Sequence, residues 1–238
     1  DCPVKALLFT NPNNPLGCVY SEAEIKAVVD WSSRNGIHLI VDEIYALSVF
    51  GTQAFVSVAS VCPDLVDHVH IVWAVSKDFG ASGLRCGVLV SENQALVGVL
   101  EGLAYWAACS GHTQHLLASL VADDVVVDTY LESNRAKLKH AYTAVTGALK
   151  DADIPYIPAE AAFFLICDLR GFLEAPTWAA EHALWRQLLE HANVNLTPGE
   201  ACRINEPGFF RLCYAGESTA AVVEAITRIG KLLASAPR

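Results

Sequence analysis

The 238-residue chain contains no methionine, and it has few charged residues. Charged side chains make up 18% of it, where about 25% is usual, while apolar residues reach 53%. A disordered chain needs low hydrophobicity and a high net charge, so this composition excludes disorder. The formal net charge of -10 has the wrong sign for a protein that binds a phosphate backbone, which argues against nucleic acid as a partner.

Long apolar runs are also absent. A membrane-spanning helix needs about 18 consecutive apolar residues, and acidic residues interrupt each candidate stretch, at Asp42-Glu43, at Glu92 and at Asp123-Asp124. The chain does not open on a basic segment followed by an apolar one, as a signal peptide would. We therefore expect a cytoplasmic protein with no membrane partner.

The cysteines show neither the spacing of a metal site nor that of a disulfide framework. There is no C-x-x-C pair, and there is no short-range cluster of Cys and His such as zinc requires. In so apolar a chain we expect them to be small core residues of a protein in a reducing compartment. The eight are Cys2, Cys18, Cys62, Cys86, Cys109, Cys167, Cys202 and Cys213.

The chain begins almost directly with a strand that we expect to be buried, whereas a domain normally has further residues before its first buried strand. Asp1 lies only a few residues before an apolar run at 4–10, and no initiator methionine precedes it. We expect the chain to be part of a longer protein that has been cut or processed.

Strand-like and helix-like patterns alternate along the first part of the chain, which predicts an α/β fold. The run at 4–10 is a buried strand, and Ser21 with Glu24 forms a capping box for a helix that ends at Asn35-Gly36. The run at 37–42 is continuously apolar, as in a strand of a parallel sheet. Further strands are expected at 69–75 and 86–91, and helices at 92–109, 112–124 and 126–151.

Shorter strands follow the long helix at 126–151, which we interpret as a connector. They predict a second, smaller α+β domain, so the expected domains are residues 1–151 and 152–238. The strands of the second domain are expected at 154–157, 162–168, 193–197 and 209–214, and its helices at 177–192 and 217–234.

A lysine and an arginine flank a glycine-rich turn after the strand at 69–75. Lys77 follows an apolar strand, where an amine loses the solvation of its charged form and becomes a usable nucleophile. Arg85 comes after Gly80 and Gly83, at a place where its planar fork could clamp a phosphate. The alternative, that both are ordinary loop cations, is equally consistent with this stretch taken alone.

Two other turns carry candidate ligands at strand ends. Asp42 ends the strand at 37–42, Tyr45 follows it, and ligands of open α/β sheets bind at the carboxyl ends of strands. A carboxylate there can face a protonated ring nitrogen, although a helix N-cap beside a core tyrosine is the commoner arrangement. Asn14, in the turn NPNNPLG after the first strand, is by itself only a turn residue.

Taken together and in this order, the three turns resemble those of pyridoxal-phosphate enzymes with the aspartate aminotransferase fold. The resemblance extends over essentially the whole chain and favours 1-aminocyclopropane-1-carboxylate synthases and their relatives. It implies an α/β fold, in which the parallel-rich sheet of a large cofactor-binding domain precedes a smaller α+β C-terminal domain. The chain corresponds only to the C-terminal portion of family members. The matching segments include VDEIYALSVF, SKDFGASGLRCG, NRAKLKHAY, FFLICDLRGFL and VNLTPGEACRINEPGFFRLCYA.

The resemblance also implies roles for individual residues around the cofactor ring. Lys77 matches the lysine that bonds the cofactor covalently and then moves the α-proton of the substrate. Asp42 matches the carboxylate that keeps the pyridine nitrogen protonated. Tyr45 and Asn14 match the pair that hydrogen-bonds the phenolic oxygen of the cofactor.

The remaining matches concern the phosphate and the substrate. Arg85 matches a phosphate ligand, and Ser76 matches the serine that the synthases have before the lysine. Ala74 departs from the family, which usually has a hydroxyl residue there that donates to the phosphate. Arg211 matches the arginine that takes the α-carboxylate of the substrate bidentately, and Asn14 is expected beside the substrate.

Two further departures bear on the substrate and on the active unit. Ala161-Ala162 stands where relatives commonly have Gly-Gly, which adds methyl groups near the expected substrate and points away from S-adenosylmethionine. The first half of family members carries the glycine-rich phosphate amides, an aromatic residue that stacks on the ring and a tyrosine given to the partner subunit. We therefore expect the missing N-terminal segment and a homodimer as partners.

Three functions stay open at this point. The leading hypothesis is a pyridoxal-phosphate-dependent lyase, in which Lys77 removes the α-proton of an amino acid and a group leaves the β or γ carbon. The alternative is an aminotransferase, which uses the same lysine and passes the amino group to a 2-oxo acid. The third is a non-catalytic relative or a truncated remnant that serves in binding or dimerisation.

Overall fold

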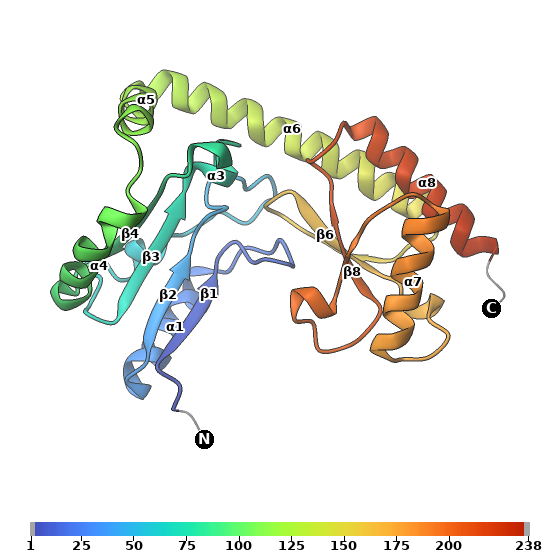
Figure 1. Cartoon of the computed structure of the whole chain (residues 1–238), viewed down its shortest axis with the longest axis horizontal. Coiled ribbons are helices and arrows are strands. Elements are labelled where there is room, and N and C mark those ends of the chain that lie inside the picture. Colours follow the sequence, from blue (N-terminus) through green and yellow to red (C-terminus); the bar gives the residue numbers. More distant parts are fainter. Residues whose placement is uncertain (1–2, 236–238) are drawn as a thin grey trace. The chain divides into compact units, whose positions relative to one another are not determined.

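The computed structural model describes residues 3–235, and the chain divides into two compact units (Figure 1). The first contains the residues up to Asn14 and those from Cys18 to Arg135, and the second contains Pro15–Gly17 and the chain from Ala136 onward. The division falls inside a long helix, whereas the sequence pattern places the domain boundary at the end of that helix, after residue 151. Residues 136–151 are therefore grouped with the second unit.

A four-stranded sheet forms the centre of the first unit. Its order is β1 (Ala6–Thr10), β2 (His38–Asp42), β3 (Val69–Ala74) and β4 (Gly87–Ser91). The first three strands run parallel, and β4 returns antiparallel beside β3. The expected α/β fold with a parallel-rich sheet is confirmed, and the parallel strands bring their carboxyl ends to one edge.

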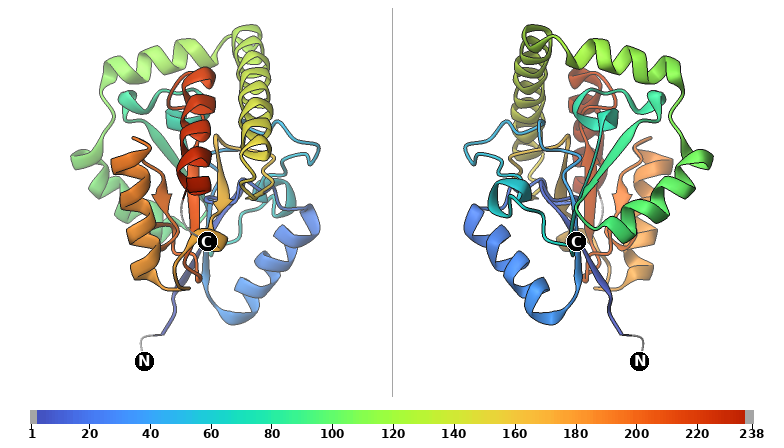
Figure 2. Two further views of the ribbon diagram at one scale, coloured as in Figure 1. Left: turned by 90° about the vertical axis from the view of Figure 1, so that its right-hand side faces the viewer. Right: turned by 90° about the vertical axis from the view of Figure 1, so that its left-hand side faces the viewer.

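Helix α1 (Glu22–Asn35) lies alongside the first strands (Figure 2) and packs on one face of the sheet. The predicted capping box is present, since Ser21 Oγ accepts from Glu24 N and Glu24 Oε2 accepts from Ser21 N at 2.8 Å. Gly36 ends the helix in the left-handed conformation, with φ of 62°. Burying each large apolar side chain of this layer stabilises the fold by about 1.5–3 kcal/mol. The buried cluster is Ile25, Val29, Leu39, Val41, Val58, Leu65, Val69 and Ile71.

Two helices of a single turn were not predicted, because four residues show no periodicity. They are α2 (Val58–Val61) and α3 (Val75–Asp78), and Val75 opens α3 instead of extending the strand expected at 69–75. The longer helices occur where the sequence predicts them. The remaining elements of this part of the chain are η1 (Ser82–Leu84), α4 (Gln94–Ala107), α5 (Gly111–Val121) and α6 (Asp124–Asp151).

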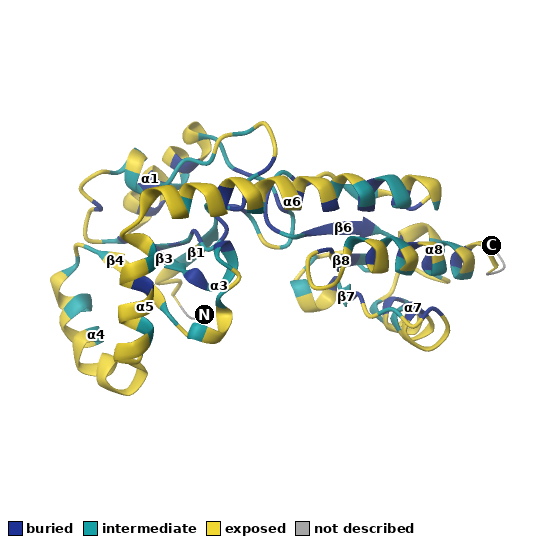
Figure 3. Cartoon of the chain, turned by 90° about the horizontal axis from the view of Figure 1, so that it is seen from above, coloured by how far each residue is buried: buried dark blue, intermediate teal, exposed yellow. Residues whose placement is uncertain are grey.

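Several large apolar residues of the first unit are exposed, and helix α4, which carries some of them, is coloured mainly as exposed in Figure 3. Helix α4 has no buried residue, and Tyr105 and Trp106 at its end are 82% and 84% exposed. On the sheet, Leu8 of β1 is 64% exposed, and Val88 and Val90 of β4 are 50% and 44% exposed. Apolar surface of this extent is typical of a face that another protein segment covers. Among the described helices, none combines the length and apolar character that crossing a membrane requires.

The second unit contains a small antiparallel sheet with order β5 (Tyr156–Ile157), β6 (Phe164–Asp168), β8 (Phe209–Cys213) and β7 (Thr197–Pro198). Its other elements are η2 (Arg170–Phe172), η3 (Glu200–Cys202), α7 (Trp178–His191) and α8 (Thr219–Ser235). The core of this unit is dense and apolar. Leu165, Ile166, Leu188, Phe210 and Ile226 all have an exposed fraction of 0%.

The strand expected at 193–197 is largely wrong. Only Thr197 of that run is in a strand, as the first residue of β7. Asn193 has φ of 52°, and a positive φ is incompatible with extended backbone. Residues 193–196, in which Val194 and Leu196 alternate with two asparagines, are therefore irregular chain between α7 and β7.

Candidate active site

Three turns that carry predicted site residues follow the carboxyl ends of β1, β2 and β3. The strands are parallel and in register, with Thr10 opposite Asp42 and Asp42 opposite Val72. The turns therefore begin at the same edge of the sheet. The predicted site residues on or beside these turns are Asn14, Asp42, Tyr45, Ser76 and Lys77.

The turn after β1 is held by Asn11, a residue that the sequence pattern does not single out. Its side chain is buried, and its Oδ1 accepts from Tyr20 N at 3.1 Å while its Nδ2 donates to Val56 O at 3.3 Å. Its own N–H donates to Asp42 O at 3.0 Å, which joins the turn to the end of β2. Asn14, the predicted ligand, is exposed on this turn.

The adjacent carboxylates of Asp42 and Glu43 have different environments. Glu43 is buried, accepts from Ser57 Oγ at 2.8 and 3.1 Å and from Val58 N at 2.8 Å, and so anchors the start of α2. Asp42 is half-buried and accepts from Ile44 N at 3.1 Å, which is its only side-chain hydrogen bond within residues 3–235. Burial raises the pKa of both carboxyl groups. Asp42 is therefore the carboxylate with an oxygen left for a ligand.

Tyr45 lies in the turn after β2, and its ring is 4% exposed. Its carbonyl accepts from Ser48 N at 3.0 Å, so the two residues belong to one hydrogen-bonded turn. Such burial is equally consistent with a tyrosine of the hydrophobic core and with a tyrosine that binds the cofactor. The role of Tyr45 toward a cofactor therefore stays a prediction.

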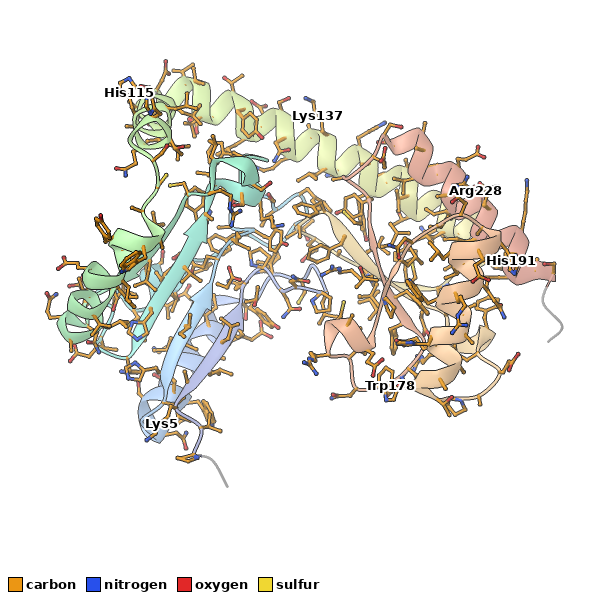
Figure 4. All side chains as sticks on the ribbon, viewed as in Figure 1. Lys5, His115, Lys137, Trp178, His191 and Arg228 are labelled. Carbon is orange, nitrogen blue, oxygen red and sulfur yellow. The ribbon has the colours of Figure 1, made fainter. Side chains whose placement is uncertain are left out.

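Lys77 lies in the single-turn helix α3, directly after β3, where the sequence pattern predicts a loop. It is half-buried, as is Ser76 before it. Ala74 is the N-cap of α3 and provides no side-chain hydrogen bond, whereas a serine or threonine there would stabilise the helix start by about 1 kcal/mol. Lys5, by contrast, precedes β1 and so stands at the opposite end of that strand from the turns (Figure 4).

Asp78 is the second residue of this region that sequence reasoning missed. Its side chain is completely buried, although it comes directly after a lysine in a polar stretch. It accepts hydrogen bonds from Ser48 Oγ at 2.6 Å, from Trp73 Nε1 at 2.9 Å and from Leu47 N at 3.1 Å. An acidic residue that follows an apolar strand containing a tryptophan is the only local signal that could have pointed to it.

Arg85 ends the turn that follows α3. It is exposed, has φ of 51° in the left-handed region, and donates from Nη1 to Ser82 O at 3.0 Å. A guanidinium has five N–H donors, so this bond leaves several for a phosphate. Gly87 lets β4 start close to β3, because a Cβ there would come within 3.3 Å of Trp73 O.

Arg211, the predicted substrate ligand, belongs to the second unit and lies on β8. Its guanidinium carbon is 5.3 Å from the ring centroid of Phe164, on the neighbouring strand β6. The loop before β8 is held by the fully buried Glu181, which accepts from Glu200 N at 3.1 Å and from Gly208 N at 2.6 Å. The sequence did not point to Glu181, because its partners lie 19 and 27 residues away.

Ala161 and Ala162 are both fully buried, with exposed fractions of 0%. Ala162 has φ of 64°, and its carbonyl accepts from Tyr214 Oη at 3.2 Å. Gly17 O accepts from Ala161 N at 3.0 Å. Methyl groups without exposed surface do not line a substrate site. The structure therefore does not support the expectation that Ala161 and Ala162 point away from S-adenosylmethionine as the substrate.

Three cavities formed by described residues of the second unit are lined by none of the predicted site residues. One is lined by residues of α7 and of the β7–η3 segment, including Trp185 and Arg203, and another lies between α6 and α8. Within the described chain, no group of three or more His, Cys, Asp or Glu side chains is arranged to hold a metal ion. The turns at the sheet edge remain the best candidate site.

Sequence comparisons link the whole chain to one family. The family model for aminotransferase class I and II matches residues 1–229. The chain is 37% identical over 231 residues to 1-aminocyclopropane-1-carboxylate synthase 6 of Arabidopsis thaliana, and 37% identical over 232 residues to the 1-aminocyclopropane-1-carboxylate synthase of Glycine max. These alignments cover 95% of this chain but 47% and 48% of the relatives, so the chain spans about half the length of the curated relatives it matches.

Solved structures also match over nearly the whole chain. An aspartate aminotransferase from Thermotoga maritima has a TM-score of 0.82 at 27% identity, and the match covers 97% of this chain and 57% of that one. The aspartate aminotransferase of Thermus thermophilus with maleate gives 0.84 at 22% identity, covering 96% and 56%. A putative aminotransferase from Clostridium difficile, described as PLP-bound, gives 0.86 at 19% identity, covering 97% and 58%. The expected aspartate aminotransferase-like fold is thereby confirmed.

Proposed function

Because the chain belongs to the aminotransferase class I and II family, we propose that it forms the lysine-bearing part of an enzyme that uses pyridoxal phosphate on an α-amino acid. The family is one of pyridoxal-phosphate-dependent enzymes. The observation that carries the proposal is the single sheet edge from which the turns of Asp42, Tyr45 and Lys77 start.

The side chains along these turns have the chemistry that pyridoxal phosphate needs. Lys77 offers an amine, Asp42 a carboxylate, Tyr45 a phenol and Ser76 a hydroxyl. Arg85 offers guanidinium donors beyond the one that binds Ser82 O. When bound, the cofactor supplies an electron sink for negative charge at the α-carbon of the substrate.

Asp42 is suited to face a positively charged ring nitrogen. Burial raises the pKa of its carboxyl group, and no cation among the described residues offsets that effect. A protonated pyridine nitrogen opposite the free carboxylate oxygen would be the missing partner, and it would favour the ionised carboxylate. Glu43 is not suited to this role, because both of its oxygens bind Ser57 and one also binds Val58.

Lys77 is the group that would hold and move a proton. The proposal is supported by the position of Lys77 in α3, directly after β3, since β3 runs parallel to the strand that ends at Asp42. In the proposed reaction, Nζ would accept the α-proton of the amino acid, and the electron pair left at the α-carbon would allow the group on the β or γ carbon to leave. Tyr45 and Asn14 would donate hydrogen bonds to the phenolic oxygen of the cofactor, and Asn14 would also lie beside the substrate.

Arg211 would bind the α-carboxylate of the amino acid through two parallel N–H donors. Its backbone is fixed between β6 and β7, opposite Ile166 and Thr197. The aromatic ring of Phe164 lies near the guanidinium, which limits the orientations that the side chain adopts.

The reaction that we favour is a lyase reaction, in which loss of the α-proton is followed by loss of a group from the β or γ carbon. The support is that curated relatives at 37% identity are 1-aminocyclopropane-1-carboxylate synthases. An aminotransferase is the second candidate, supported by the aspartate aminotransferase of Thermotoga maritima at 27% identity. Both reactions would use Lys77 and Arg211 in the same way.

We also propose that the active unit is a homodimer of longer protomers, which include an N-terminal segment. The relatives are about twice as long as this chain. The exposed apolar surface of β1, β4 and α4 is what such partners would cover.

Product analysis tests the reaction. The full-length protein, loaded with pyridoxal phosphate, is incubated with a panel of α-amino acids in the presence and absence of a 2-oxo acid. A lyase forms product without the 2-oxo acid, and an aminotransferase requires it. If the cofactor binds but neither product forms in any reaction, both activities are rejected in favour of a binding or dimerisation role.

A further inference from the structure

The side chain of Asp78, the residue after Lys77, has no role in the proposed chemistry, yet it is completely buried. Its Oδ1 accepts from Ser48 Oγ at 2.6 Å, and its Oδ2 accepts from Trp73 Nε1 at 2.9 Å and from Leu47 N at 3.1 Å. A carboxylate is retained in such a place only where donors satisfy it, and here three do.

These bonds join two turns of the candidate active site. Leu47 and Ser48 belong to the turn after β2, in which Ser48 N donates to Tyr45 O. Trp73 lies on β3, the strand that leads into the helix of the lysine. Asp78 thus links the backbone beside Lys77 directly to the backbone beside Tyr45.

Helix α6 adds support from a third direction. Asn134 Nδ2 donates to Asp78 O at 3.3 Å, and the ring of Tyr130 stacks on Phe79 with centroids 5.3 Å apart. Burial raises the pKa of the Asp78 carboxyl group, whereas the bonds from Ser48, Trp73 and Leu47 and the charge of Arg135 lower it. The three groups that contact the Asp78 carboxylate all donate hydrogen bonds to it, which is the arrangement that an ionised carboxylate needs.

Helix α3 cannot fix the lysine by itself. It has four residues, and its N-cap, Ala74, provides no side-chain hydrogen bond. Helices as short as this are not stable without external contacts. The bonds to Asp78 are the contacts that hold its last residue in place.

We propose that Asp78 is a positioning residue, which sets the place of the Lys77 amine relative to Tyr45 and Asp42 without touching cofactor or substrate. The inference rests on the proposed function, because it assigns Lys77 the bond to pyridoxal phosphate. It goes further by stating which side chain brings that amine into place.

The rate at which the cofactor becomes bonded to Lys77 tests this. In the full-length protein, pyridoxal phosphate is added, samples are reduced with borohydride at timed intervals, and peptide mass spectrometry measures the label at Lys77. Asp78→Ala removes all three bonds, and we expect the labelling rate to fall about ten- to a hundredfold, as for lost hydrogen bonds to a charged acceptor.

Asp78→Asn separates position from charge. Its carbonyl oxygen can still accept from Leu47 and Trp73, and its amide can donate to the Ser48 hydroxyl, which rotates to accept. We expect this variant to label Lys77 within about threefold of the natural protein, since the contacts with Leu47 and Trp73 persist and the contact with Ser48 is kept with its direction reversed. Rescue by the asparagine would show that the connection, and not the charge, positions the lysine.

Ser48→Ala is a milder variant that keeps the test valid if Asp78→Ala fails to fold. It breaks one bond, and we expect labelling to be slowed several-fold. In a soluble variant with both Asp78→Ala and Ser48→Ala, the labelling of Lys77 should be no slower than in Asp78→Ala alone, because both substitutions break the same connection.

Glu181→Ala is the matched control. Glu181 is an equally buried carboxylate that accepts hydrogen bonds from two backbone N–H groups, but it lies in the second unit. We expect it to lower the melting temperature without slowing the labelling of Lys77. Natural labelling rates in both Asp78→Ala and Ser48→Ala would overturn the proposal, and so would equal slowing in Glu181→Ala. If Lys77 of the natural protein is never labelled, the proposed function fails instead.

Discussion

The two units hold their predicted site residues by different means. In the first, three buried polar side chains, those of Asn11, Glu43 and Asp78, tie together short turns at one sheet edge. In the second, Arg211 lies on a strand whose neighbouring residues, Phe210 and Leu212, are buried in an apolar core. The position of a side chain thus depends on directional bonds in the first unit and mainly on packing in the second. We therefore expect polar substitutions in the first unit to act through lost hydrogen bonds or lost chemistry, and substitution of Arg211 in the second unit to act on substrate affinity.

Lys77→Ala should have the largest effect. The proposed reaction has no other group to move the α-proton, and loss of such a proton carrier slows turnover by about 100- to 10,000-fold. Because Lys77 is only half-buried, the unfolding free energy should change by less than about 0.5 kcal/mol. Steady-state kinetics and a urea unfolding curve measure both quantities. If turnover stays within about tenfold of the natural rate, Lys77 does not move the α-proton.

Glu43→Ala should have the next largest effect, and on stability. It leaves Val58 N without its acceptor and removes the charged partner of Ser57, which should cost about 2–3 kcal/mol of unfolding free energy. Asp42→Ala is its control, because Asp42 accepts only from Ile44 N. That substitution should weaken cofactor binding while destabilising the protein by less than about 1 kcal/mol. If Asp42→Ala lowers the stability more than Glu43→Ala does, and Glu43→Ala weakens cofactor binding more, the roles assigned to the two carboxylates are wrong.

Arg211→Lys should have a smaller effect that is confined to the substrate. A lysine makes one charge-assisted bond where the arginine fork makes two, so affinity for amino acids should fall roughly ten- to a hundredfold. Cofactor affinity should stay the same. Titrations of cofactor and of amino acid in the same preparation separate these outcomes, and an equal loss of both would contradict the role.

Ala162→Gly should have the smallest effect, and it should be stabilising. Ala162 adopts φ of 64°, where an L-residue is strained by about 1 kcal/mol and a glycine is not. The greater freedom of glycine in the unfolded chain offsets part of the gain, so we expect a net increase of about 0.5 kcal/mol. Ala161→Gly, at a residue without positive φ, is the control and should be destabilising. A lower melting temperature for Ala162→Gly would show that its methyl packing outweighs the strain.

The elements predicted from the sequence were those with a local signal. The capping box of Ser21 and Glu24, the glycine after α1 and the apolar runs of β2 and β3 depend on residues close together in the chain. The order of the three turns at the strand ends followed from the same runs. The single-turn helices α2 and α3 had no such signal.

The supports of the candidate site could not be predicted in this way. Asp78 binds Leu47 and Ser48 across about 30 residues of chain, and Glu181 binds Glu200 and Gly208 across 19 and 27. No neighbour in the sequence distinguishes Glu181 from a solvated residue, and the only local signal for Asp78 is the apolar strand with Trp73 that precedes it. The positive φ of Asn193 that shortens the strand expected at 193–197 lies just after α7, where Val194 N donates to Leu188 O at 3.1 Å and closes the end of the helix.

The most direct measurement of the central claim is the identity of the lysine that carries the cofactor. The full-length protein is loaded with pyridoxal phosphate, reduced with borohydride, digested and mapped by mass spectrometry. We expect one pyridoxyl label, on Lys77, at the carboxyl edge of the sheet. A label on Lys5, at the other end of β1, or on Lys26 in α1, with none on Lys77, would contradict it.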